Sequence, residues 1–572
     1  MTPTPPAHEL RAILAAYESA TPPEAGVPDW LRRSWNDPEG FAATLAPAHV
    51  GRGAPFKSRA GQHHDFFHDL MGRHAATERI ALRTYDRARG WQTLSYRQLH
   101  DQAVRRATAW AQQGVKPGAK VCLVFNPGPE LLVSLGAALG LGACISFLPP
   151  VGRRFVARRL AALAPEHVAA DAHQAPLLGP FAKCLLATQA PPTPTLASYT
   201  YKPGEVVGLL FSPLATPAGV PVPLLAGDAW LGALVDGLLT FGLSPGEHLA
   251  APGFHPLQHL PTLLFATLLR GATYLHLEPA DVEASPTLLT EHPIRALGVT
   301  PALRDASLRA RTSLKTVGHW FRNPEGPLDW QAWRAWVKQC GLASVPCANV
   351  LVDAAAGGTV LCSQRRVGDV HLDAAPAPGR RWALWDFTQT GQETAGDTGL
   401  FTLLPPEGRA PSHIILTRVN EHYQYAGGRE ARREGRVYPA GEVTEALREA
   451  PGPSLVTSVL PVPTGLAGQY RQVLLVFTEG RMPGPESSAA EIRRRLELQL
   501  GAEFFPDRVE CFPLHARRTE GQLNEAWCHA QYLTGSLKHK ASDPLFQSLT
   551  ALRGHVLHGA GGATPGMPEP KR

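Results

Sequence analysis

The sequence contains no apolar run long enough to cross a membrane and no pair of cysteines with the C-x-x-C spacing of a zinc or redox site. Its 8 cysteines are scattered, mostly among apolar neighbours, which is typical of reduced thiols and not of a disulfide framework. The N-terminal segment carries prolines where a signal peptide has its basic and apolar regions. These absences predict a cytoplasmic protein without a membrane span or disulfides.

Neither sign of charge has a large excess. The chain has 55 Lys and Arg against 49 Asp and Glu, and the basic residues form no stripe of the kind that binds a nucleic-acid backbone. The G-x-S-x-G elbow of serine hydrolases and the H-E-x-x-H motif of zinc proteases are also missing. We therefore expect no nucleic-acid partner and neither of these two hydrolase chemistries.

The chain is rich in turn residues, with 54 Gly and 54 Pro among 572 residues, and is otherwise of ordinary globular composition. Residues 1–60 hold one short amphipathic helix candidate, Glu9 to Ala20, followed by a Pro/Gly/Trp-rich passage. We interpret them as an N-terminal extension that wraps onto the main body. Residues 541–572 end in a Gly/Pro-rich tail that we expect to be disordered.

Two stretches alternate strands with helices. Apolar runs at 121–125 and 144–148 flank a helical pattern from Pro129 to Gly142. A second stretch has strands at 206–211 and 274–278, with helical patterns near 227–241 and 257–269 between them. This order predicts βαβ units and parallel sheets covered by helices. The charged Gly/Arg segment 427–436 then marks a domain boundary.

Five segments together resemble the adenylate-forming (ANL, AMP-binding) superfamily. GVKPGAKVCLVFNPGPELLVSLGAALGLGACISFLPP is similar to its first signature block, and later blocks follow in the family's order at 249–275, 299–306, 378–404 and 435–447. The joint occurrence of weak matches over residues 70 to 530 makes chance similarity improbable. The resemblance implies an α/β fold: a large domain, 61–426, of layered α/β subdomains with mainly parallel sheets, and a small mobile α+β domain, 427–540.

Members of that superfamily activate a carboxylic acid by its attack on the α-phosphate of ATP. The acyl group of the adenylate then usually passes to a thiol such as CoA. The resemblance therefore implies ATP, Mg²⁺ and CoA as cofactors, an acyl or aryl carboxylate as substrate, and an active site in the cleft between the two domains.

The phosphate loop of the family, T-S-G-T-T-G-x-P-K-G, corresponds here to FSPLATPAGV. Ser212, Thr216 and Gly219 are retained as phosphate contacts, whereas Pro213 and Ala218 stand where the family has Gly and Lys. Proline has no N–H to offer an anion and alanine has no charge. An ordinary turn with incidental hydroxyl groups explains this segment at least as well.

The family segment that contacts the adenine, the α-phosphate and Mg²⁺ corresponds to NVLVDAAAGG. Leu351, Ala354 and Ala355 stand at its Tyr, Thr and Glu positions, so the metal-holding carboxylate is missing. Asp353 is a neighbouring acid that would serve Mg²⁺, which needs only one or two protein carboxylates. The interpretation we favour from the sequence is that Asp353 is a solvated loop acid.

The hinge motif retains Gly428 and Arg429 but has Ala431 at the hinge position itself. No T-G-D precedes it, and Asn420 or Glu421 is left as a contact for a ribose hydroxyl, with an ordinary surface strand as the rival explanation.

The C-terminal catalytic lysine of the family is replaced by Gln522. An amide donates a hydrogen bond but does not neutralise phosphate charge. Four arginines nearby are candidates to compensate, although a solvated basic surface is the simpler explanation: Arg517, Arg518, Arg432 and Arg433.

Histidines provide two further candidates. His255 stands where the family places a residue beside the acyl pocket, with a buried, hydrogen-bonded structural histidine as the alternative. The cluster His63, His64, Asp65 and His68 contains an i, i+4 pair with metal-ligand spacing, but a helix surface is the favoured interpretation. The glycines of GAALGLG fall at a helix end, where they indicate close packing and not a dinucleotide site.

The predicted function is that of an AMP-dependent synthetase-like protein in which adenylation is lost or strongly weakened, leaving a role in binding a ligand or a partner. An active acyl- or aryl-CoA ligase, or acyl-AMP ligase, with rewired residues is the first alternative. A structural subunit of a biosynthetic assembly, held by the extension and the tail, is the second.

Overall fold

The computed structural model describes residues 13–14, 27–50, 54–187, 196–211, 219–324, 330–368, 370–386, 392–404, 414–420, 422–428, 432–433, 436–449, 455–463, 470–479, 484, 487–519, 522–546 and 548–549. Most of the helix expected at 9–20 and most of the expected tail lie outside them. The chain divides into two units, one of residues 1–150 and 156–437, the other of residues 151–155 and 438–572. The boundary between residues 437 and 438 falls directly after the charged segment 427–436.

The first unit contains a five-stranded sheet in the order β5-β3-β4-β6-β7. Its parallel part is formed by β3 (Lys120–Val124), β4 (Cys144–Leu148), β5 (His167–Ala170) and β6 (Val206–Leu210), and β7 (Val222–Leu225) pairs with β6 in the antiparallel sense. Helices cover such a sheet on both faces, which explains the uninterrupted apolar strands β3 and β4. The predicted parallel sheet is confirmed.

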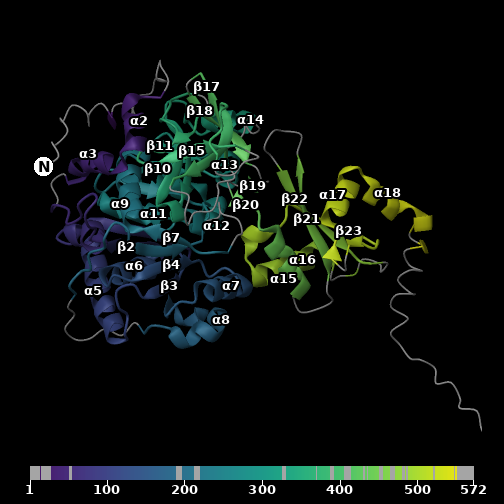
Figure 1. Cartoon of the computed structure of the whole chain (residues 1–572), viewed down its shortest axis with the longest axis horizontal. Coiled ribbons are helices and arrows are strands. Elements are labelled where there is room, and N and C mark those ends of the chain that lie inside the picture. The colour runs from purple at the N-terminus through teal and green to yellow at the C-terminus, as the bar shows by residue number, and fades with distance from the viewer. Residues whose placement is uncertain are drawn as a thin grey trace, which may run out of the picture. The chain divides into compact units, whose positions relative to one another are not determined.

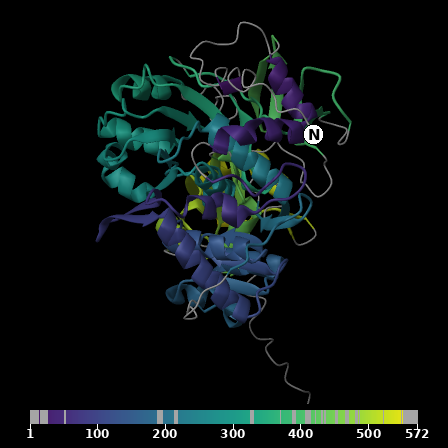
Figure 2. The ribbon, with the colours of Figure 1, turned by 90° about the vertical axis from the view of Figure 1, so that its left-hand side faces the viewer.

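Helices α5 (Tyr96–Gln112), α6 (Pro129–Gly140) and α7 (Arg153–Leu163) accompany this sheet, shown in blue in Figures 1 and 2. Ser95 and Gln98 begin α5 with a capping box, and Pro129 begins α6 in the first turn, where its missing N–H costs nothing. Gly136 of α6 lies so close to Met71 that a Cβ would meet its sulfur at 2.6 Å. The close-packing interpretation of these glycines is confirmed.

The same unit contains a nine-stranded mixed sheet in the order β14-β13-β12-β11-β10-β8-β9-β1-β2, with parallel pairing from β12 to β1. Its strands are β1 (Ile80–Asp86), β2 (Gly90–Ser95), β8 (His248–Ala250), β9 (Thr273–His276), β10 (Ile294–Gly298), β11 (His319–Arg322), β12 (Cys347–Asp353), β13 (Gly358–Cys362) and β14 (Ala375–Pro376).

Helices of this part of the unit are α9 (Ala226–Val235), α10 (Pro256–His259), α11 (Thr262–Leu269), α12 (Pro279–Ala284), α13 (Pro301–Arg309) and α14 (Trp330–Gln339). The single helix expected at 257–269 is two helices. The helix expected at 227–241 is α9 followed by a π-helical turn, η4 (Asp236–Thr240).

Smaller elements complete the first unit. The N-terminal helices α2 (Asp29–Asn36) and α3 (Pro38–Val50) belong to it, and α3 packs on α9 (Figure 1). Short helical segments are α4 (Phe66–Leu70), η1 (Gly72–His74), η2 (Ala172–Gln174), α8 (Ala175–Leu178), η3 (Gly179–Cys184) and η5 (Pro286–Thr290). A four-stranded antiparallel sheet contains β15 (Trp382–Trp385), β16 (Thr398–Leu403), β17 (Ile414–Val419) and β18 (His422–Gly428), and β19 (Arg432–Arg433) pairs with β20 (Arg436–Val437).

The second unit is built around a three-stranded sheet of β21 (Val456–Pro463), β22 (Tyr470–Phe477) and β23 (Arg508–Phe512). Around it are α15 (Ala440–Glu449), α16 (Ala489–Gln499), η9 (Ala502–Phe504), α17 (Glu525–Leu533), α18 (Ser536–Ser542) and the hairpin of β24 (Arg518–Thr519) and β25 (Gln522–Leu523). The predicted small α+β body is confirmed as a fold.

All 8 cysteines are free thiols, six of them buried, as the sequence predicts. Within the part of the chain that the structure describes, no helix combines the length and the apolar character needed to span a bilayer.

Candidate functional site

Three segments that carry the family motifs meet in the first unit. The 3₁₀ turn η7 (Ala354–Ala356), which follows β12, contacts β6, β7 and α10. Helix α10 also contacts β4 and β12. Because β4 and β6 are parallel neighbours, their carboxyl ends lie at one edge of the five-stranded sheet, and ligands of open α/β sheets bind at such an edge. We therefore take this meeting point as the candidate site.

The phosphate-loop segment joins β6 to β7. Ser212, Thr216 and Ala218 lie outside the described residues, whereas Phe211 is buried before the segment and Gly219 follows it. Gly219 has a φ of 91°, a backbone conformation that glycine adopts without strain. The retained glycine is therefore accounted for by the geometry of the turn.

Two arginines of α7 flank this segment, and the sequence analysis missed both. Arg159 is only 4% exposed, and its guanidinium carbon lies 5.9 Å from the centre of the Phe211 ring. A Cβ built on Gly219 would stand 4.0 Å from Nε of Arg158. The signal that would have found them is the run RRFVARRL directly after the first family block.

His255 caps the N-terminus of α10. Its Nδ1 accepts a hydrogen bond from the backbone N–H of Leu257 at 3.2 Å, so the neutral ring carries its proton on Nε2. His259 donates from Nδ1 to the carbonyl of His255 at 3.2 Å. His255 is thus a buried, hydrogen-bonded histidine beside η7, and its role as a pocket contact stays a prediction.

Asp353 is not the solvated loop acid favoured from the sequence. It is 9% exposed at the end of β12, and its carboxylate accepts a hydrogen bond from the backbone N–H of Ala355 at 3.0 Å, capping η7. The carboxylate is held by the turn because short helical segments leave their first N–H groups without internal partners. Ala354 and Ala355 are buried beside it.

The turn that follows η7 packs directly on α9. A Cβ on Gly232 would lie 1.7 Å from the carbonyl oxygen of Gly357, so glycine is required there. Asp236 accepts hydrogen bonds from the N–H of Thr359 at 3.0 Å and from the hydroxyl of Thr240 at 3.1 Å. Burial raises the pKa of Asp236, while these hydrogen bonds and the charge of Arg380 oppose the rise.

These residues fit Mg²⁺ poorly. Ala355 supplies no oxygen at the metal-holding position, and the nearest carboxylate, that of Asp353, is engaged with the turn. Among the described residues, no three His, Cys, Asp or Glu side chains cluster in a way that would hold a metal ion.

In the second unit, Gln522 lies in β25, paired with Thr519 across the hairpin; its side chain lies outside the described residues. Arg517 and Arg518 are exposed, and Arg518 forms an ion pair with Glu479 at 2.9 Å. Exposure agrees with the simpler interpretation of these two arginines as solvated surface. Arg429, Ala431 and Glu421 lie outside the described part, as do the side chains of Arg432 and Arg433.

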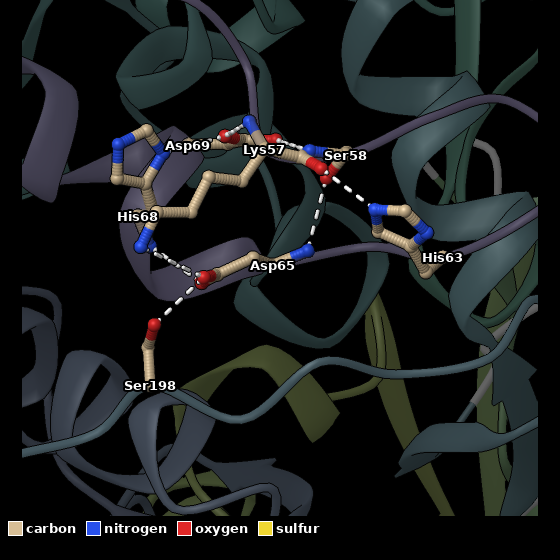
Figure 3. A network of polar contacts seen from close by, with 7 residues as sticks. All are labelled: Lys57, Ser58, His63, Asp65, His68, Asp69 and Ser198. Atoms are coloured by element: carbon tan, nitrogen blue, oxygen red, sulfur yellow. Dashed lines mark hydrogen bonds and ion pairs between the residues drawn. The ribbon is translucent and has the colours of Figure 1, made fainter.

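The histidine cluster near residue 64 is not a helix surface. His64 and Asp65 are 1% and 2% exposed, and Figure 3 shows Asp65 in a network of polar contacts. Its carboxylate accepts from the backbone N–H of His68 at 2.8 Å and from the hydroxyl of Ser198 at 2.7 Å. Asp69 similarly accepts from backbone N–H groups of the preceding segment, so the acids tie the chain together.

Comparisons with known proteins agree with this architecture. Residues 72–174 match the family model described as AMP-binding enzyme. A search of curated proteins finds no match.

Solved structures share the fold. An o-succinylbenzoate CoA synthetase from Bacillus subtilis, solved as a double mutant with a product analogue, is 15% identical, with a TM-score of 0.60 over 81% of this chain and 98% of that one. An artificially fused adenylation–PCP di-domain NRPS from Klebsiella oxytoca is 14% identical, with a TM-score of 0.61 over 78% and 85%. An acyl-CoA synthetase from Brucella canis is 16% identical, with a TM-score of 0.54 over 88% and 99%.

The family model covers the first signature block, and the shared fold extends over both units. Residues 72–174 of this chain therefore match the model of AMP-binding enzymes, and the chain shares the fold of CoA synthetases and of an adenylation domain.

Proposed function

We propose that this protein binds a carboxylate or acyl ligand, or a partner protein, at the candidate site of the first unit, with adenylation lost or strongly weakened. The observation that carries the proposal is the buried turn at Ala355, where the metal-holding carboxylate of the family is absent and Asp353 is used as a helix cap. The replacements at Ala218 and Gln522 point the same way. Loss of one preorganised electrostatic group commonly costs about 10²- to 10³-fold in rate.

The free thiols favour the cytoplasm as the place of this activity. The proteins with a similar fold are named as synthetases of CoA esters and as an adenylation domain fused to a carrier. From them we take an acyl or aryl acid as the ligand class, with CoA or a carrier protein as the acceptor that an active relative would use.

Pyrophosphate exchange with a broad panel of carboxylic acids tests the proposal. We expect exchange at background level in the pure protein, beside an active acyl-CoA synthetase as positive control. Calorimetric titration with ATP and Mg²⁺ is expected to give weak binding without magnesium dependence. Tight, magnesium-dependent binding, or exchange abolished by His255→Ala, would refute the loss of adenylation.

One observation favours the alternative of an active ligase with rewired residues. Arg159 and Arg158 bring two permanent cations to the ends of the phosphate-loop segment, where the family lysine is missing. If they replace it, Arg159→Gln abolishes any exchange activity, while Arg105→Gln, an exposed arginine of α5, leaves it unchanged. Exchange that survives Arg159→Gln would show that Arg159 does not replace the lysine, and absence of exchange in the parent protein would remove this alternative.

A further inference from the structure

A cavity of about 300 Å³ lies in the first unit, and no residue of the phosphate-loop segment, η7 or α10 lines it. Its walls are α3, the start of α9, the segment 60–64 and the turn 379–381. This volume is at the lower end of the range for sites that bind small molecules, about 300 to 1,000 Å³. The cavity is therefore large enough for a compact ligand.

Two buried aromatic side chains on the wall have polar atoms without partners. His64 is 1% exposed and packs against Trp230 with ring centroids 5.0 Å apart. Both ring nitrogens of His64 and Nε1 of Trp230 lack a hydrogen-bond partner among the described residues. Buried polar groups are nearly always satisfied in folded proteins. Unsatisfied groups beside a cavity are available to pair with a bound ligand.

The backbone holds His64 firmly in this wall. Its N–H donates to the carbonyl of Tyr201 at 2.8 Å, and the N–H of Tyr201 donates back to its carbonyl at 2.9 Å. The next residue, Asp65, is fixed by the hydrogen bonds drawn in Figure 3. The histidine is therefore held in place before any ligand arrives, which lowers the entropic cost of binding.

Two acids and two arginines line the cavity. Glu39 and Asp228 line it, and Oε2 of Glu39 lies over Gly61, 2.8 Å from where a Cβ would be. The guanidinium of Arg380 lies near Asp236, on whose pKa its charge acts, and its Nη2 is 3.4 Å from where a Cβ on Gly358 would be. Arg381 and Glu39 are both exposed to solvent, whereas Asp228 is half-buried. Burial lowers the pKa of His64 to about 4, so this ring adds no positive charge near pH 7.

We propose that this cavity binds a small organic cation, such as an amine or an amidinium, with its charge between Glu39 and Asp228. The faces of Trp230 and His64 attract a cation as well as covering its hydrocarbon part. The neutral imidazole of His64 also presents one unprotonated nitrogen, to which an N–H of the cation donates once the ligand is seated.

Three probes of nearly equal shape test the charge preference by calorimetry on the full chain: benzamidine, which is cationic, benzamide, which is neutral, and benzoate, which is anionic. We expect benzamidine to bind about two- to fivefold more tightly than benzamide, and benzoate to bind most weakly. Glu39→Gln and Asp228→Asn each lower the affinity for benzamidine about two- to fivefold and leave that for benzamide unchanged.

Glu283→Gln removes an exposed acid of α12 that does not line the cavity, and serves as the matched control with no expected effect. His64→Phe keeps an aromatic ring but removes the acceptor nitrogen, and is expected to weaken benzamidine binding. A cooperative thermal unfolding transition, measured for each variant, checks that the variant is folded. Equal affinity for the three probes, no binding at all, or a preference for benzamidine that survives both acid substitutions would overturn the proposal.

Discussion

The neutral, buried His64 predicts a specific acid sensitivity of the first unit. Burial is the largest cause that lowers its pKa from 6.5 to about 4, outweighing the opposing charge of Asp69. A histidine with a depressed folded-state pKa takes up its proton in the unfolded chain first. Its contribution to stability is therefore complete above pH 6.5 and is lost as the pH falls towards 4.

The linkage relation gives the magnitude. At pH 5.0 the unfolded imidazole is mostly protonated and the folded one mostly neutral, which costs about 2 kcal/mol of unfolding free energy relative to pH 7.5. His74 and His248, whose pKa values burial lowers to about 3 and about 4, add their own losses. His64→Phe removes only the contribution of His64 to this pH-dependent loss of unfolding free energy. The phenyl ring keeps the ring contacts with Trp230 and Phe66.

The assay is urea unfolding at pH 7.5 and 5.0, followed by tryptophan fluorescence, because every tryptophan except Trp527 lies in the first unit. We expect the loss between the two pH values to be about 2 kcal/mol smaller in His64→Phe than in the parent. His173→Phe, at an exposed histidine, is the control and keeps the parental loss. An unchanged loss in His64→Phe would show that His64 is protonated in the folded protein, refuting the reasoning.

Three further substitutions test the packing and the caps. Gly232→Ala places a methyl group 1.7 Å from the carbonyl oxygen of Gly357, so calorimetry should show that the free energy of unfolding falls by about 3 kcal/mol. Gly204→Ala is the control and should change the free energy of unfolding little, because a Cβ there meets nothing within 4 Å. Ser95→Ala removes the capping box of α5 and is expected to cost about 1 kcal/mol in urea unfolding; a variant as stable as the parent would contradict the cap. Asp65→Asn weakens both the cap of α4 and the contact with Ser198. Thermal unfolding should show a loss of stability of about 2 kcal/mol. An unchanged stability would show that the network of Figure 3 is dispensable.

The strands and long helices of this fold follow from local pattern. Strand β3 is an apolar run because both of its faces are covered, and α6 begins at a proline and ends just before Gly142, which has a φ of 76°. Such signals are carried by neighbouring residues, so they are visible in the sequence. The break between α10 and α11 falls at Pro261, which is also a local signal. The π-helical turn at Asp236 instead has a partner distant in sequence, Thr359.

The errors at Asp353 and at the histidine cluster have a common cause. Both acids look solvated when a polar residue is assigned to the surface by type, yet both accept backbone N–H groups at the start of a short helical turn. An acid followed by a short helical turn is a capping signal that the sequence does contain. The basic run around Arg159 is visible in the sequence, but the position of Arg159 beside Phe211 is not, because this contact joins residues that are distant along the chain.

The absence of a metal-holding acid at Ala355 is expected to stabilise the folded protein. Placing a carboxylate at this position tests that expectation. Ala355 is 8% exposed in a turn packed against β6, β7 and α10. A carboxylate introduced there is buried without a cation, which costs several kcal/mol unless the side chain is protonated or paired. Ala355→Glu should therefore lower the midpoint of thermal unfolding, while Ala355→Gln, which has the same size and no charge, should lower it less.

Addition of Mg²⁺ to the Ala355→Glu variant shows whether the rest of the site still holds a metal ion. If the rest of the site no longer holds a metal, the midpoint of Ala355→Glu is indifferent to Mg²⁺, as expected when Asp353 is fully used by the cap. A midpoint that rises with Mg²⁺ in Ala355→Glu but not in Ala355→Gln would mean that a metal site persists without its acid. The replacement at Ala355 alone would then account for the loss of adenylation that we propose, since one side chain would restore the ion that the remaining residues still accommodate.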